Sequence, residues 1–266
     1  MELFSFVRDI LESAETADAH LPATVLYNEG WLLRLVLHSA AAGIDCLPFR
    51  LEPKARWFSE ALLYSAFLAR RRGDELAESW THADAVVGHF HFDGTKAGVV
   101  LDSAAGQFIV CEAKIFSGLS KGTRRAVDYD QAARNVACMA WTLKMADRPI
   151  TEYKSLGFYV FAPQQQIDQG VFGEHVTGAS IRRKIANRIA AFEPEWRTTR
   201  LEPWQTKWVH ALLERIEMQV VAWETIVNRI QSVDASFGSE IASFYAKCLR
   251  YCAEMGSAGI SNEAVE

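Results

Sequence analysis

The segment "QFIVCEAKIFSG", residues 107–118, constrains the fold more than any other stretch of the chain. Side chains alternate between the two faces of a strand, so Phe108, Val110, Glu112 and Lys114 share one face. The opposite face is also largely apolar. The segment therefore predicts the central strand of a sheet, with a carboxylate and an ammonium group at its end.

A buried carboxylate needs a partner, because leaving Glu112 unpaired would cost several kcal/mol or force it to take up a proton. The simplest explanation is an ion pair between Glu112 and Lys114 at the exposed end of the strand. Three further polar residues argue for more than a pair: Asp84, which opens the strand "DAVVGHF"; Glu29, on an otherwise apolar helix stripe; and Gln131, early in the next helix.

Each of these three residues also has an ordinary explanation. Asp84 fits a turn before a strand, Glu29 fits an acid in the first turn of a helix, where it favours the helix dipole, and Gln131 fits a solvated side chain. Taken together, they are better explained by convergence in one cleft. Two or three carboxylates in such a cleft suit Mg²⁺, which takes oxygen ligands, and a nearby lysine can orient or help deprotonate a water. This combination predicts phosphodiester hydrolysis.

Hydrophobic spacing predicts the elements around this strand. Residues 83–114 are expected to form an antiparallel meander of three strands. The other expected elements are a strand at 156–163 and helices at 25–42, 55–72, 124–147, 209–230 and 239–252. We expect an α/β core over residues 1–165 and a helical extension over residues 166–266.

The order of these elements and motifs resembles the PD-(D/E)xK nuclease superfamily. The motifs are the helix with Glu29, the strand with Asp84, "CEAK" at 111–114, "YDQAARN" at 129–135 and the strand "GFYVFAP". The resemblance covers about residues 29–163. It implies a restriction-endonuclease-like αβββαβ core, with a mixed central sheet flanked by helices.

The resemblance also implies roles for individual residues. Asp84 and Glu112 would bind the catalytic Mg²⁺ or Mn²⁺, with the backbone carbonyl of Ala113 as an additional ligand. Lys114 would position the water and stabilise developing charge. Glu29 would reach a second metal or the water shell, and Gln131 would orient Lys114 or the DNA. The implied reaction is hydrolysis of DNA phosphodiester bonds, in restriction, defence or repair.

The sequence departs from this pattern in two places. Ala83 stands where the superfamily's name expects proline. In addition, 28 positions separate Asp84 from Glu112, and a regular meander would place Asp84 opposite a residue near Ala105. Bringing Asp84 opposite Glu112 needs an irregularity of about seven residues, which "SAAGQ" after Asp102 could supply as a bulge. Asp93 and Asp102 are the alternative first ligands.

Other polar features leave alternatives open. His89 and His91 point the same way on a strand, as a metal pair or as partly buried histidines. The segment 117–125 is a candidate for phosphate contacts or a solvated loop. Arg182, Arg183, Lys184 and Arg188 are expected on a charged outer helix face, with a basic track as the alternative. Either side of the helix carrying Gln131 could meet the sheet.

Composition limits the function classes. A net charge of −5 argues against holding polyanions by bulk electrostatics, so DNA binding would need a local patch. Five scattered cysteines favour reduced thiols in the cytoplasm. No signal peptide or membrane span is expected. The competing class is a catalytically inactive nucleic-acid-binding or regulatory protein that retains the nuclease fold, and the helical extension could form a homodimer, contact DNA or bind a partner.

Overall fold

The computed structural model describes residues 3–16, 18–94, 98–122 and 126–260. The chain divides into two compact units, each described here by itself: Met1–Leu47 with Glu224–Glu266, and Pro48–Trp223. The two units do not follow the expected boundary at residue 165. Among the described residues, no helix is both long and apolar enough to cross a membrane.

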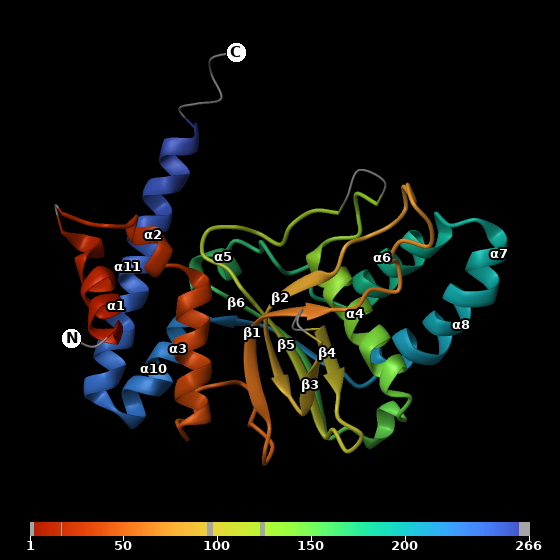
Figure 1. The fold of residues 1–266 in the computed structure, drawn as a ribbon, viewed down its shortest axis with the longest axis horizontal. Coiled ribbons are helices and arrows are strands. Elements are labelled where there is room, and N and C mark those ends of the chain that lie inside the picture. The colour runs from red at the N-terminus through yellow and green to blue at the C-terminus, as the bar shows by residue number, and fades with distance from the viewer. Residues whose placement is uncertain (1–2, 17, 95–97, 123–125, 261–266) are drawn as a thin grey trace. The chain divides into compact units, whose positions relative to one another are not determined.

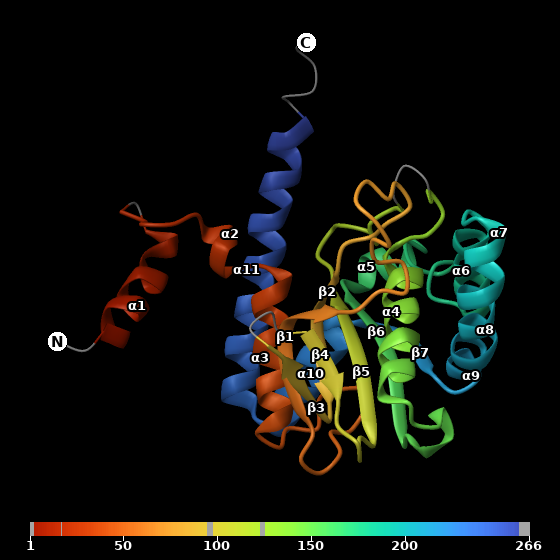
Figure 2. The same ribbon diagram turned by 45° about the vertical axis from the view of Figure 1, so that its right-hand side comes forward.

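The larger unit is built on a seven-stranded mixed sheet (Figures 1 and 2), whose strand order is β3-β4-β1-β2-β5-β6-β7. The fold is therefore mixed α/β with a central sheet flanked by helices, as expected. The strands β5, β6 and β7 run parallel to one another, whereas β2 is antiparallel to both β1 and β5. The strands are β1 (Arg56–Leu63), β2 (Thr81–Gly88), β3 (Phe90–Asp93), β4 (Gly98–Leu101), β5 (Gln107–Ala113), β6 (Ser155–Ala162) and β7 (Glu217–Ala222).

The central position of β5 is confirmed, since all seven of its residues are buried. The strand β6 also forms where expected and ends before Pro163, which cannot donate to a ladder. Between these strands in the sequence lies the helix α4 (Gln131–Ala146). Asp130 is its N-cap, and the side chain of Asp130 accepts a hydrogen bond from Ala133 N at 3.1 Å. This cap sets the start of the helix and so fixes where Gln131 lies.

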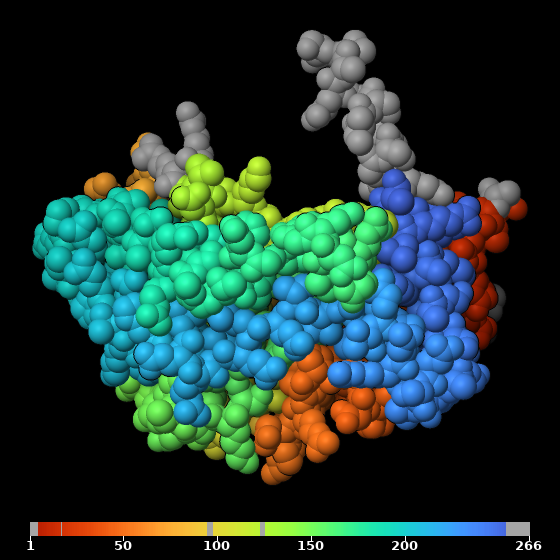
Figure 3. Space-filling model, turned by 180° about the vertical axis from the view of Figure 1, so that it is seen from behind, coloured from red at the N-terminus to blue at the C-terminus, as the bar shows by residue number. Residues whose placement is uncertain are grey.

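The helix α4 packs against β1, β2 and β4, and both α6 (Gly178–Ala190) and η4 (Gln205–Val209) pack on α4 (Figure 2). Both sides of α4 are buried over most of its length, although Met145 near its end is exposed; Val127, expected on the same helix, lies before α4 and is also exposed. Residues 164–222 form much of the surface of this unit in Figure 3, coloured green to light blue. The remaining helices here are η2 (Ile150–Glu152), α5 (Gln164–Asp168), α7 (Pro194–Trp196), η3 (Arg197–Leu201), α8 (Glu202–Trp204) and α9 (His210–Leu213).

The predicted helix over 55–72 is wrong, because Arg56–Ser59 and Ala61–Leu63 pair with β2. The prediction of one continuous helix over 209–230 is also wrong. Helical structure ends at Leu213, Glu217–Ala222 pairs with β6 as the strand β7, and a new helix begins at Trp223. In both segments, pairing with a neighbouring buried strand outweighs local helix propensity.

The smaller unit is helical. Its elements are α1 (Leu3–Glu12), η1 (Ser13–Glu15), α2 (Ala23–Leu26), α3 (Glu29–Ala41), α11 (Ala235–Ile260) and, after Trp223, α10 (Trp223–Val233). The helix α11 packs on α2 and α3. The side chain of Asn28 caps α3 by accepting from Trp31 N at 3.0 Å, so the predicted helix over 25–42 begins four residues later.

Candidate active site

The candidate site lies where the ladder between β2 and β5 ends. The last pair of this ladder is Ala85 with Cys111, so the next position brings Asp84 opposite Glu112. The N–H of Ala113, one residue further, donates to Asp84 Oδ2 at 2.8 Å. A carboxylate thus replaces a main-chain acceptor, and the two strands part at the point where the acidic side chains gather.

The long separation between Asp84 and Glu112 is explained by the hairpin β3–β4, which is inserted between β2 and β5. The hairpin pairs within itself and contacts β1 through the bridge of Gly98 with Leu62. The expected three-strand meander is therefore wrong, because β2 pairs directly with β5. The irregularity that aligns Asp84 with Glu112 is therefore not a bulge but the complete inserted hairpin β3–β4.

The register of β2 and β5 places Asp84 opposite Glu112, and the charge of Asp84 acts on the Glu112 carboxyl. Asp84 is partly buried, whereas Glu112 has no exposed surface. Burial raises the pKa of the Glu112 carboxyl well above its usual value, and the charge of Asp84 raises that pKa further, against the opposing effect of Lys114. Two such groups need a shared proton or a cation near them.

Lys114 is held beside Glu112. Its Nζ lies 3.3 Å from Glu112 Oε2, and its side chain is 11% exposed. The main chain of Lys114 is also fixed, because its N–H donates to Phe161 O at 2.8 Å and its carbonyl accepts from Trp223 Nε1 at 3.0 Å. The ammonium group therefore approaches the carboxylate pair from a rigid backbone and retains some access to solvent.

Gln131, the first residue of α4, joins the cluster through its side chain. Its Nε2 donates to Glu112 Oε2 at 2.7 Å, and its Oε1 accepts from Ser120 N at 3.2 Å. Gln131 is therefore not a solvated side chain. It ties the loop after Lys114 to the buried carboxylate.

Asn135 is a member of the cluster that sequence reasoning missed. Its Nδ2 donates to Glu112 Oε1 at 2.7 Å, and its own Oδ1 is buried without a partner in the described structure. The signal was present, because Asn135 follows Gln131 by four residues, and residues four apart lie on the same side of a helix. Each oxygen of Glu112 thus receives an amide donor from α4.

The other predicted site residues lie elsewhere or are not placed. Glu29 is the first residue of α3 in the smaller unit, so its distance from Glu112 is not determined. Asp93 accepts a hydrogen bond from Tyr64, and Asp102 contacts His91, so both are engaged around the hairpin. The carbonyl of Ala113 remains a predicted ligand.

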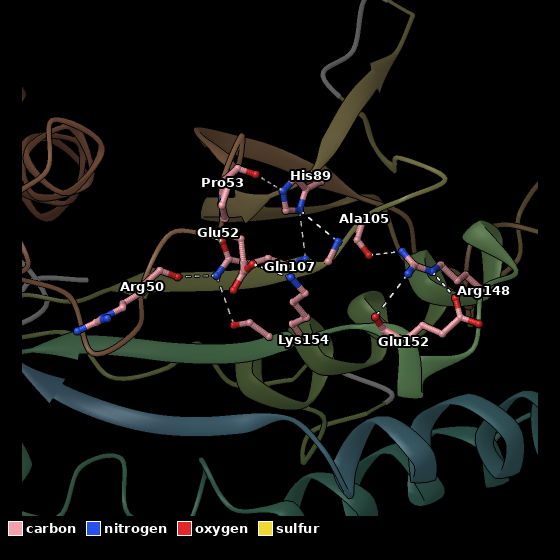
Figure 4. Close-up of polar contacts among 11 residues, drawn as sticks. Arg50, Glu52, Pro53, His89, Ala105, Gln107, Arg148, Glu152 and Lys154 are labelled. Atoms are coloured by element: carbon pink, nitrogen blue, oxygen red, sulfur yellow. Dashed lines mark hydrogen bonds and ion pairs between the residues drawn. The ribbon is translucent and has the colours of Figure 1, made fainter.

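The two histidines do not act as a pair. His89 is held at the far end of β5, where its Nδ1 accepts from the main-chain N–H groups of Gly106 and Gln107 and its Nε2 lies 3.0 Å from Pro53 O (Figure 4). His91 Nδ1 instead lies 2.8 Å from Asp102 Oδ1. His89 therefore serves to hold the main chain together, and we do not propose a metal site there.

The expected charged outer face on α6 is wrong for two of its four basic residues. Lys184 and Arg188 are buried and form ion pairs with Asp130 and Glu78, respectively. Arg182 and Arg183 are exposed. Of the segment 117–125, residues 123–125 lie outside the described residues, so the proposed phosphate contact there is described only in part.

Within the described ranges, no group of three or more His, Cys, Asp or Glu side chains is arranged to hold a metal ion. The donor set is two carboxylates, Asp84 and Glu112. Such a pair fits Mg²⁺ or Mn²⁺, because these ions often use one or two carboxylates and take their other oxygen ligands from water and substrate phosphate. The cluster can therefore hold a divalent cation next to an ammonium group.

Comparison with family models, with curated proteins and with solved structures finds no significant match for this chain.

Proposed function

We propose that this protein is a metal-dependent DNA endonuclease of the PD-(D/E)xK type, acting in restriction, defence or DNA repair. The carrying observation is that Asp84 stands opposite Glu112 at the end of the β2–β5 ladder, with Lys114 Nζ 3.3 Å from Glu112 Oε2. The chain order α3, β1, β2, β5, α4, β6 supports the proposal, because it matches the αβββαβ order of a restriction-endonuclease-like core. The hairpin β3–β4 would be an insertion in that core.

The proposed cofactor is Mg²⁺ or Mn²⁺, held by Asp84, Glu112 and the carbonyl of Ala113. When bound, the cation would polarise the phosphodiester and favour ionisation of a water. Its charge would also relieve the repulsion between the two carboxylates. Burial and then the charge of Asp84 raise the pKa of the Glu112 carboxyl, and a bound cation would offset both effects.

The protein's own side chains would divide the remaining work. Lys114 would position the attacking water. As a neutral amine it would accept the proton of that water at Nζ, and the resulting ammonium group would stabilise the charge that develops on the phosphate oxygens. Gln131 and Asn135 would keep Glu112 in one rotamer, since each donates to one of its oxygens. Glu29 remains a candidate for a second metal or the water shell.

The decisive experiment is cleavage of plasmid and phage DNA with Mg²⁺ or Mn²⁺. We expect Lys114→Ala to lower the rate by about 10² to 10⁴, the usual contribution of a positioned acid or base. Lys154→Ala is the matched control, because its side chain is 73% exposed at the other end of the sheet. No cleavage by folded wild-type protein, or equal rates for both variants, would refute the catalytic proposal.

A metal titration tests the cofactor separately. Increasing Mg²⁺ should raise the melting temperature of the wild type more than that of Glu112→Gln, because a ligand that binds only the folded state stabilises it. Equal shifts would exclude Glu112 as a ligand.

The second candidate is a DNA-binding or regulatory protein that retains the fold without catalysis. The observation favouring it is that Glu112 has no exposed surface and already receives three donors, from Gln131, Asn135 and Lys114. DNA binding by wild-type protein that neither cleaves DNA nor responds to Mg²⁺ would favour this candidate. A cytoplasmic location and homodimer formation remain expectations from the sequence.

A further inference from the structure

A cavity of about 630 Å³ opens beside the first turn of α4. This volume lies in the range of small-molecule sites. Its floor contains the buried side chains of Asp130, Ser180 and Lys184, and its rim carries exposed charged groups. None of the groups that contact Glu112 lines it, so it is distinct from the candidate active site.

The floor of the cavity is fixed by an ion cluster. Asp130 Oδ1 caps α4, while its Oδ2 lies 2.5 Å from Lys184 Nζ and 2.6 Å from His175 Nδ1. The negative charge of Asp130 and the positive charge of Lys184 neutralise each other at the floor of the cavity. The cavity is therefore preformed, and the groups free to select a ligand lie on its rim.

The rim carries charges of both signs: Lys121 and Arg183 are basic, whereas Asp128 and Glu174 are acidic. All four are exposed, and within the described residues none of them forms an ion pair. A ligand that satisfies this rim needs an anionic group for the cations and hydrogen-bond donors for the carboxylates. A nucleotide with an amino-bearing base has both, because Asp and Glu accept from exocyclic amines.

The cavity adjoins the candidate active site through two consecutive residues. Asp130 forms part of the floor, whereas Gln131 donates to Glu112, and their Cα atoms are about 3.8 Å apart. The rim residue Lys121 follows Ser120, whose carbonyl accepts from Gln131 N at 3.0 Å. The start of α4 therefore contributes to both the cavity and the candidate site, so a DNA strand bound at that site could place a neighbouring nucleotide in the cavity.

We propose that this cavity is a nucleotide pocket that holds the DNA residue next to the cleaved bond and prefers bases that carry an exocyclic amine. Lys121 and Arg183 bind the phosphate, and Asp128 and Glu174 accept hydrogen bonds from the base. This assignment rests on the proposed nuclease function for the identity of the polymer. The binding of a free nucleotide does not depend on catalysis.

The test is titration of the wild-type protein with dAMP, dCMP, dGMP and TMP in EDTA, followed by NMR or calorimetry. We expect the three amino-bearing nucleotides to bind more tightly than TMP. Arg183→Ala should weaken binding about tenfold, which corresponds to about 1.4 kcal/mol. Arg182→Ala is the matched control, since Arg182 is an exposed neighbour on α6 that does not line the cavity.

A second variant tests base selection. Replacing both Asp128 and Glu174 with alanine should abolish the preference over TMP while leaving phosphate-dependent binding in place. The proposal is overturned if no nucleotide binds, if Arg182→Ala and Arg183→Ala weaken binding equally, or if free glutamate and lysine bind as well as dCMP. Because EDTA removes the metal, failure of DNA cleavage leaves this result interpretable, and failure of nucleotide binding leaves the cleavage assay unaffected.

Discussion

The hydrogen bond between Asn135 and Glu112 offers the sharpest test of how the carboxylate is held. It joins Nδ2 to Oε1 over 2.7 Å, and neither side chain is exposed. A hydrogen bond to a charged group contributes about 1.5–3 kcal/mol, whereas one between neutral groups contributes about 1 kcal/mol. We therefore expect Asn135→Ala to lower the free energy of unfolding by about 2 kcal/mol when Glu112 is ionised.

A double-mutant cycle isolates this interaction from the loss of packing. In a Glu112→Gln background the partner is neutral, so Asn135→Ala should cost only about 1 kcal/mol. The free energies are measured by urea denaturation of metal-free protein at alkaline pH, followed by the fluorescence of the eight tryptophans. An equal cost of Asn135→Ala in both backgrounds would refute the inference that Asn135 stabilises the charge on Glu112.

Three further predictions concern pH, thiols and the backbone. Because the folded-state pKa of Glu112 is raised, its stabilising contribution is complete below its ordinary pKa and is lost as pH rises through the raised value; urea midpoints of metal-free Glu112→Gln should not show this fall. Cys252 should react with iodoacetamide before Cys111, whose burial raises its thiol pKa; the order is checked by mass spectrometry, and early labelling of Cys111 in folded protein would contradict it. Gly88→Ala should cost at least about 2 kcal/mol, because a Cβ would lie 2.1 Å from a main-chain carbonyl oxygen at φ +148°. Gly43→Ala is the control, because Gly43 also has a positive φ, +101°, but its Cβ would meet no atom within 4 Å; similar urea midpoints would count against the close approach.

Sequence patterns predicted the strands whose burial is continuous. The strands β5 and β6 were found because every residue in each of them except Ser155 is buried, so their composition carries the signal directly. The strands β1 and β7 were missed because they are more exposed, and their apolar residues also fit a helical period. What decides these segments is the neighbouring strand, which local spacing does not contain.

The candidate site was predictable to the extent that it lies on well-predicted elements. The meeting of Glu112, Lys114 and Gln131 was predictable, because the sequence predicted both the strand β5 and the helix α4, on or next to which these residues lie. Asn135 was overlooked because an asparagine within an alanine-rich helix carries no strong signal by itself. The burial of Lys184 could not be foreseen either, since its partner Asp130 is 54 residues away in the sequence.

The hairpin β3–β4 also has a practical consequence. Because β2 and β5 pair directly, the residues between them form an insertion that leaves the β2–β5 ladder and returns to it. The number of residues between Asp84 and Glu112 therefore does not determine their distance in space. A search that scans a fixed window between the two acids would pass over this arrangement.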